Sequence, residues 1–316
     1  MNNQRRQFLN QLSFITAFAA LNRPMGSIAS ISKHINTLHS VKDAVTVYHT
    51  NDLHGNFNAV FNGSGGIPQI KALLQKQETN GLILDAGDFL NPAHSLSKQH
   101  DVIYAMNSMG YLAATIGDNE LLLGEDHLAQ LIPSMNFKLV NCNYQFNNTL
   151  SKLVAPYIII NSGKFKIGIT GVGHQVKGVK YNDAITCANN IASVLKHKEK
   201  CDLVICLSHL GYEQQGDMPD NRKLARQSEN IDMIISGHNR KLLKGSMVLL
   251  NKQKQEVVLN QAGWDGLMMG KAVFNFKNGN QKSGFRGKNI IPGHTNESFV
   301  SAFPELRLME KQLMAS

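Results

Sequence analysis

Residues 45–55 read VTVYHTNDLHG, an apolar, β-branched run that leads directly to two metal-binding side chains, Asp52 and His54. Apolar runs of this kind predict strands. Four more such runs lead to single metal-binding residues, namely Asp88, Asp118, His209 and His238. In open α/β sheets, ligands bind beyond the carboxyl ends of the strands, so we expect these side chains to meet at one point. Carboxylates and imidazoles around a shared Asp suit two divalent cations, a usual arrangement for hydrolysing phosphate esters.

Helical signals alternate with these strands. Apolar residues recur at helical spacing in residues 67–77, 101–109 and 184–197, as expected of helices with one buried face. Gly110 follows the second of them, where a glycine commonly ends a helix. This alternation predicts βαβ units and largely parallel strands.

Further strand signals come without long helices between them. Residues 157–160 and 165–170 flank a short turn and predict a hairpin. More strands are predicted at residues 247–250, 257–260 and 269–276. Both patterns fit an α/β fold that is a four-layer αββα sandwich, with two mixed β-sheets flanked by helices.

The two ends of the chain differ from its middle. Arg5-Arg6 is followed by Gln7-Phe8-Leu9, a modestly apolar run and a small-x-small cleavage pattern. These features are typical of a twin-arginine signal peptide, with a Sec signal or a fortuitous Arg pair as the alternative. We therefore expect export by the twin-arginine machinery to the periplasm or beyond. The predicted division is a signal peptide at 1–29, a linker at 30–44, one domain at 45–277 and a polar tail at 278–316.

Composition narrows the class of protein. The formal net charge is +9, but Lys and Arg are dispersed rather than gathered in the stripe that nucleic acid would need. No run of about 18 apolar residues is found, so no membrane span is expected. Cys142 and Cys206 lie in apolar stretches as small core residues. A disulfide after export is an open alternative, because the sequence cannot pair the four cysteines.

The motifs around the metal-binding side chains resemble those of a known family. They read TNDLHG at 50–55, DAGD at 85–88, SHLG at 208–211 and SGH at 236–238. Together they resemble the calcineurin-like metallophosphoesterases, and most of all their 5'-nucleotidase and UDP-sugar hydrolase branch, over roughly residues 45–276. We find no counterpart of the second domain that recognises the base in two-domain members, so a single-domain exported member is expected.

The resemblance implies roles for individual residues. Asp52, His54 and a bridging Asp88 would hold the first metal ion. Asp88, His209 and His238 would surround the second, and Asp118 stands where the family has a ligand Asn. Two divalent ions are expected, with one bound ion as the alternative, and this mixture of oxygen and nitrogen ligands suits Zn, Mn, Fe or Co.

Two departures affect the expected catalysis. Asn119 stands where the family has its catalytic His, and Leu122 stands where an Asp orients that His. Asn cannot transfer a proton, and the loss of a positioned general acid typically costs about 10²–10⁴ in rate. His94, His100 and His127 lie near this motif as replacement proton donors, with ordinary surface histidines as the alternative.

Arg240 stands where the family has a ligand His or a Gln. A guanidinium has no free lone pair, so it cannot bind a metal ion. Two interpretations stay open: Arg240 binds the substrate phosphate, or it points outward from a decayed site. An ion pair between Asp118 and Arg240 is a further expectation.

These observations predict a metal-dependent, 5'-nucleotidase-like phosphoesterase that hydrolyses phosphate monoesters or nucleotides by attack of a metal-bound hydroxide. Its activity is expected to be weakened, because the dyad and one metal ligand are replaced. Its expected partner is a small phosphorylated substrate, nucleotides included, and not nucleic acid. The alternative is a catalytically inactive pseudo-phosphatase that binds phosphate, a nucleotide or a protein partner.

Overall fold

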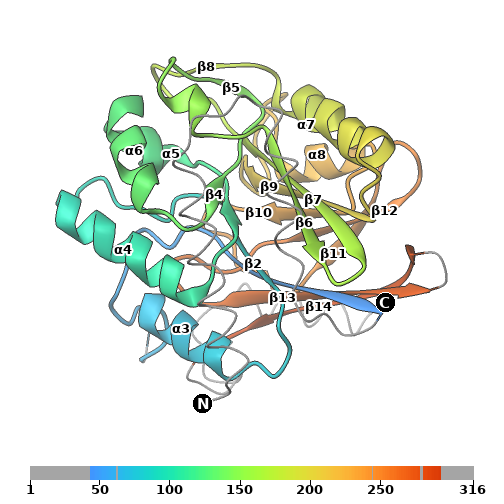
Figure 1. Ribbon diagram of the computed structural model, residues 1–316, viewed down its shortest axis with the longest axis horizontal. Coiled ribbons are helices and arrows are strands. Elements are labelled where there is room, and N and C mark those ends of the chain that lie inside the picture. Colours follow the sequence, from blue (N-terminus) through green and yellow to red (C-terminus); the bar gives the residue numbers. More distant parts are fainter. Residues whose placement is uncertain (1–42, 62, 244, 278–279, 293–316) are drawn as a thin grey trace.

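The computed structural model describes residues 43–292 except 62, 244 and 278–279 (Figure 1). The predicted signal peptide at 1–29 and nearly all of the predicted linker at 30–44 lie outside the described residues. Within the part that is described, two six-stranded sheets pack face to face with helices on their outer sides.

The first sheet has the strand order β14-β13-β1-β2-β3-β4. Strands β1 to β4 run parallel, and β13 pairs antiparallel with both β1 and β14. Their bounds are β1 Ala44–Thr50, β2 Leu82–Asp85, β3 Ala113–Ala114, β4 Lys138–Leu139, β13 Met269–Lys277 and β14 Gln281–Ile290.

The second sheet has the order β11-β12-β10-β9-β7-β6. Its four central strands are parallel, and the edge strands β6 and β11 are antiparallel to their neighbours. The antiparallel pair β6–β7 confirms the predicted hairpin. The bounds are β6 Tyr157–Ser162, β7 Phe165–Gly173, β9 Leu203–His209, β10 Met233–Ser236, β11 Met247–Leu250 and β12 Glu256–Asn260, and a separate short pair joins β5 Tyr144–Gln145 to β8 Lys180–Tyr181.

Helices cover the outer face of each sheet. The helices α3 to α6 share one buried cluster on the first sheet, and α7 and α8 share another on the second (Figure 1). A third cluster fills the space between the sheets, with Val47, Leu84, Ile169 and Ile205 among its members. The helices are α3 Ile67–Gln75, α4 Leu96–Met109, α5 Asp118–Leu121, α6 Glu125–Leu131, α7 Ala184–Ser193 and α8 Asn221–Gln227, with shorter turns η3 Ile132–Ser134, η4 Leu150–Lys152 and η5 Val194–Lys198. The predicted four-layer αββα architecture is confirmed.

Local chemistry moves two helix boundaries from their predicted places. Helix α4 begins at Leu96 rather than at residue 101, because Ser95 accepts a hydrogen bond from the Lys98 backbone as its N-cap. It ends as predicted, with Gly110 in the left-handed conformation at φ 82°. The predicted helix over 184–197 is α-helical only to Ser193 and continues as the π-helical turn η5.

The polar tail predicted from residue 278 is wrong for Gln281–Ile290, which form the edge strand β14. Most of this strand is exposed, so it carries no apolar alternation from which a strand could be predicted. Backbone pairing to β13 and the contact of Phe285 with Phe274 hold it in place. The domain predicted to end at 277 therefore extends at least to Ile290, and residues 293–316 lie outside the described part.

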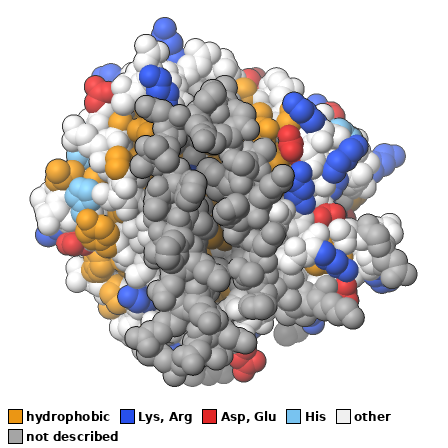
Figure 2. Space-filling model, viewed as in Figure 1, with side chains coloured by type: hydrophobic (Ala, Val, Ile, Leu, Met, Phe, Trp, Pro, Cys, Tyr) orange, Lys and Arg blue, Asp and Glu red, His pale blue; other side chains and the backbone are white. Residues whose placement is uncertain are grey.

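Two smaller expectations concern membranes and thiols. In the described residues, no helix combines the length and apolar character needed to span a bilayer. All four cysteines are free thiols. Cys206 is fully buried in the cluster that α7 and α8 cover, and Cys142 packs against that cluster. On the face shown in Figure 2, several of the described Lys and Arg side chains lie at the right, with others at the top and at the lower left.

Candidate active site

Every metal-binding residue predicted from the sequence lies at or just beyond the carboxyl end of a strand. Asp52 and His54 follow β1, Asp88 follows β2, and Asp118 follows β3. His209 is the last residue of β9, and His238 follows β10. The parallel strands of both sheets deliver these side chains to a common edge, as expected of α/β sheets.

The ligand atoms group into two clusters of three. Within each cluster, one ligand atom from each residue lies within 4.8 Å of the others. The buried cluster contains Asp52, Asp88 and His209. The half-buried cluster contains Asp118, His174 and His238. His174 follows β7, and its place in the second cluster was not predicted.

In the buried cluster, the tautomer of His209 is set by a backbone carbonyl. Its Nδ1 lies 2.7 Å from the Ala86 oxygen, so this nitrogen donates its proton there. Nε2 then faces Asp88 Oδ2 at 3.4 Å and Asp52 Oδ1 at 4.0 Å. Among the described residues this buried nitrogen has no hydrogen-bond partner. A metal ligand His is typically oriented in this way, with its other nitrogen held by a carbonyl.

Electrostatics in the buried cluster favour a cation. Burial opposes a charge on His209, but Asp88 and Asp52 outweigh it and raise its pKa well above the ordinary value. Burial itself raises the pKa of the 1% exposed Asp52. Two carboxylates that share so little water need a positive charge nearby, which an imidazolium or a metal ion can provide.

In the half-buried cluster, His174 Nδ1 lies 2.9 Å from Asp118 Oδ1, and His238 Nδ1 lies 3.6 Å from Asp118 Oδ2. The two imidazole rings are 4.1 Å apart between centroids. Burial, together with His209 and His174, lowers the pKa of His238 to about 4. His238 is therefore neutral at pH 7 and keeps a lone pair for coordination.

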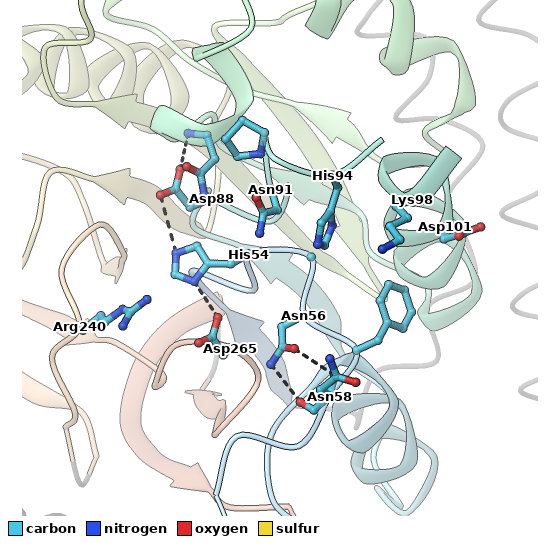
Figure 3. A pocket seen from close by; sticks show the side chains of 14 residues that line it. His54, Asn56, Asn58, Asp88, Asn91, His94, Lys98, Asp101, Arg240 and Asp265 are labelled. Carbon is cyan, nitrogen blue, oxygen red and sulfur yellow. Dashed lines mark hydrogen bonds and ion pairs between the residues drawn. The ribbon is translucent and has the colours of Figure 1, made fainter. Parts of the chain in front are cut away.

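His54 lies at the edge of the buried cluster rather than within it. Its Nε2 is 3.9 Å from Asp88 Oδ2, and its Nδ1 lies 2.7 Å from Asp265 Oδ1 (Figure 3). Burial opposes a charge on His54, but the hydrogen bond to Asp265 helps to raise its pKa. Asp265 lies beyond β12 and was missed because it matches none of the motifs considered. It orients His54 as a carboxylate typically orients a ligand imidazole.

The loops that carry these residues have an unusual backbone. Asp52, His54, Asp88 and His238 have φ values between 48° and 90°, a region that non-glycine residues rarely adopt. Such conformations cost of order 1–3 kcal/mol each and cluster at functional sites. The same bend brings the backbone N–H of His238 to 3.0 Å from Asp52 Oδ1.

Close packing explains why a glycine precedes Asp118. A Cβ on Gly117 would lie 2.4 Å from Asp88 Oδ1 and 2.8 Å from His209 Nε2, so no side chain fits there. Glu120 secures the same loops, because its buried carboxylate accepts hydrogen bonds from the backbone N–H groups of Asp88, Leu90 and Gly117. The motif that carries Asp118 is therefore held rigidly against Asp88.

A cavity of about 820 Å³ opens beside the buried cluster. Asp88 and His54 line it together with Asn119, Arg240 and His94 (Figure 3). The Asn119 side chain donates to the Leu90 carbonyl at 3.1 Å. Arg240 is exposed, and its guanidinium lies 5.9 Å from the centre of the Trp264 ring. The cavity thus joins candidate metal ligands to a cationic side chain that an anionic substrate could reach.

The sequence also predicted an ion pair for Asp118 and three replacement proton donors. The ion pair predicted between Asp118 and Arg240 is wrong, because Asp118 contacts His174 and His238 instead. Of the three histidines considered as proton donors, only His94 lines this cavity. His127 contacts Gln99, and His100 stacks on Tyr104.

The donor atoms present fit divalent transition metals. The two clusters together offer three carboxylates and three imidazoles, a mixture that suits Zn, Mn, Fe or Co better than Mg or Ca. His209 Nε2, Asp118 Oδ1 and His174 Nδ1 are buried and have no hydrogen-bond partner in the described structure. Buried polar atoms normally have a partner, so these three are consistent with ligand atoms.

Comparison with known proteins gives the family. The calcineurin-like phosphoesterase family model matches residues 45–239. The 5'-nucleotidase of Vibrio cholerae serotype O1 is 26% identical over 286 residues, covering 78% of this chain and 51% of that protein. Protein UshA of Yersinia enterocolitica is 25% identical over 276 residues, covering 75% and 50%. The chain therefore spans about half the length of these curated relatives.

Solved structures agree with this likeness. The 5'-nucleotidase precursor from Thermus thermophilus superposes with a TM-score of 0.71 at 25% identity, covering 79% of this chain and 54% of that one. The calcineurin-like phosphoesterase YfkN from Bacillus subtilis, at 21% identity and a TM-score of 0.62, shares the fold over 87% of this chain and 99% of its own. The chain belongs to the calcineurin-like phosphoesterase family, in the branch that contains the bacterial 5'-nucleotidases.

Proposed function

We propose that this protein is a metal-dependent hydrolase of phosphate monoesters, nucleotides included, that works without the usual histidine acid. The observation that carries the proposal is the meeting of Asp52, Asp88 and His209 in one buried cluster, with His209 Nε2 unpartnered. A buried group of this kind is costly unless it binds a cation.

Two divalent ions are proposed, held by the residues predicted from the sequence. Asp52, His54 and Asp88 would hold the first, and Asp88, His209 and His238 would approach the second together with Asp118. Bound ions would supply Lewis acidity toward a phosphoryl oxygen and lower the pKa of a coordinated water. The position of His238 supports its assignment, since its Nδ1 lies 3.6 Å from Asp118 Oδ2.

Arg240 is proposed to bind the phosphate of the substrate. It lines the cavity with His54 and Asp88, and a guanidinium can form paired hydrogen bonds with phosphate oxygens. Its exposure leaves it free to move toward a ligand.

Asn119 limits the leaving group. It lines the cavity where a proton would be delivered, yet its amide cannot act as an acid. Substrates with good leaving groups, such as aryl phosphates and pyrophosphates, need no protonation and should react best. Ordinary nucleoside monophosphates should react more slowly.

A second candidate function is supported by Leu122. It is 60% exposed at the position where an Asp would orient a catalytic His, and its aliphatic side chain offers no acceptor for an imidazole N–H. A pseudo-phosphatase that binds phosphate, a nucleotide or a protein partner would retain the clusters without turnover. The export signal predicted at 1–29 would place either protein in the periplasm.

Elemental analysis with a parallel assay tests the proposal. The protein is purified without chelator, its metal content per chain is measured, and turnover of p-nitrophenyl phosphate and AMP is compared. We expect two ions per chain and faster turnover of the aryl ester. EDTA should abolish this activity, and Zn, Mn or Co should restore it. Bound metal without turnover of either substrate would favour the pseudo-phosphatase, and no metal with no turnover would overturn the hydrolase.

A further inference from the structure

His174 belongs to the half-buried cluster, although the sequence motifs did not account for it. It follows β7, whose parallel pairing with β9 carries it to the same edge as His209. Its side chain is 27% exposed, and it faces Asp118 and His238, which are similarly half-buried. Six strands, not five, thus deliver a candidate ligand to this edge.

The contact of His174 with Asp118 is not an ordinary hydrogen bond. Its Nδ1 lies 2.9 Å from Asp118 Oδ1, yet both atoms are buried without a hydrogen-bond partner in the described structure. They are close but not aligned, as expected when two ligand atoms point toward a third position rather than toward each other.

The contact of His174 with His238 also favours a shared ligand position. The ring centroids of the two imidazoles are 4.1 Å apart. One ligand atom from each imidazole and one carboxylate oxygen of Asp118 lie within 4.8 Å of one another. One divalent ion would therefore satisfy the nitrogen atoms and the carboxylate together.

We propose that His174 is a metal ligand and that, with Asp118 and His238, it forms a centre of its own beside the buried cluster of Asp52, Asp88 and His209. This inference rests on the proposed metal-dependent function and refines how the ligands are divided between the two ions. Two imidazoles and one carboxylate form a ligand set typical of Zn and also suited to Co and Fe, with positions left open for water or substrate.

If each cluster holds its own ion, one ion can be lost while the other stays bound. Metal-free wild-type protein is titrated with Zn²⁺ by calorimetry, and Co²⁺ binding is followed by visible absorption. The same titrations are made on His174→Ala and on His197→Ala, a control histidine that is exposed in η5. Wild type and His197→Ala should bind two ions. His174→Ala should bind one ion unchanged and the other about a hundredfold more weakly.

A second variant guards against misfolding. In His174→Gly, added imidazole should restore both the second ion and its Co²⁺ spectrum, which a merely structural role of His174 could not produce. Two ions with unchanged affinity in His174→Ala would overturn the inference and leave the proposed function intact. Loss of turnover with both ions retained would also overturn it, because His174 would then act on the substrate. No ion in the wild type would instead contradict the proposed function itself, and this inference with it.

Discussion

The buried and half-buried clusters are built from similar side chains but are held differently. Asp52, Asp88 and His209 are at most 7% exposed. Each also has a hydrogen bond that holds it in place, with the His238 backbone, the Glu120 carboxylate and the Ala86 carbonyl respectively. The half-buried cluster draws Asp118 from a four-residue helix and His174 from the end of β7. The buried cluster matches the family motifs throughout, whereas the half-buried one contains a substituted residue and an unpredicted one.

This difference shows where such a site can change. A buried carboxylate that loses its cation is left with a large desolvation cost, so few substitutions are tolerated there. The half-buried side chains retain some access to water, so a substitution among them costs less. Catalytic chemistry in this chain is therefore expected to differ from its relatives on the half-buried side.

The largest effect should come from Asp88→Asn. Asp88 Oδ2 faces both His54 and His209, and its Oδ1 accepts the backbone N–H of Asn119. The amide of Asn has the same shape as the carboxylate but no charge, so it should bind the metal ions more weakly. A loss of several kcal/mol in binding free energy corresponds to a fall of about 10³ in kcat.

The matched control is Asp217→Asn on the exposed surface, which should leave both metal content and kcat unchanged. An Asp88→Asn protein that keeps two ions and normal turnover would remove the buried cluster from the mechanism.

The next effect should be a gain, from Asn119→His combined with Leu122→Asp. Asn119 already lines the cavity beside Asp88, so an imidazole there can reach a leaving group. We expect kcat for AMP to rise about 10²-fold, with a much smaller change for p-nitrophenyl phosphate, which needs no acid.

Each single variant serves as the control, because the imidazole and the carboxylate that orients it should act only together. Equal gains for both esters would argue against proton transfer, and no gain with two ions bound would favour the pseudo-phosphatase.

A smaller effect should follow Asp265→Asn. Its carboxylate holds His54 at 2.7 Å, and loss of such an orienting group typically weakens metal binding 10–100-fold. We expect one of the two Zn²⁺ affinities to fall about tenfold in calorimetry, while the His174 centre keeps its affinity. Equal weakening of both ions would mean that the clusters are not independent.

The last prediction concerns stability rather than catalysis, at the buried His49 of β1. Burial lowers the pKa of His49 to about 3 in the folded protein. Below about pH 6.5, His49 becomes protonated in the unfolded chain but stays neutral in the folded protein. The free energy of unfolding is therefore not reduced by His49 above pH 6.5, and it decreases as the pH falls below this value. We expect the free energy of unfolding to fall by about 1.4 kcal/mol for each pH unit below 6.5, until the pH reaches the pKa of about 3 that His49 has in the folded protein.

Urea unfolding between pH 7 and pH 4 measures this slope in wild type and in His49→Asn. The difference in unfolding free energy between the two should shrink as the pH falls. A constant difference would mean that His49 is not held neutral by its burial.

Much of the fold was predictable from local pattern. Helix α3, the β6–β7 hairpin and the central strands follow from apolar periodicity, since their buried faces need apolar residues at fixed spacing. The edge strand β14 was not predictable, because pairing of its backbone with β13 does not depend on apolar side chains. The start of α4 at Leu96 depended on a single cap at Ser95.

The sequence alone determined which residues end the strands, and hence that Asp52, Asp88 and His209 would meet. It could do so because parallel strands share a carboxyl edge and each motif is local in the chain. Only the tertiary structure decided that His174 joins Asp118 and His238, and that Asp265 orients His54. These partners are far apart in sequence or lie in loops without a periodic pattern, so their contacts depend on how the two sheets pack.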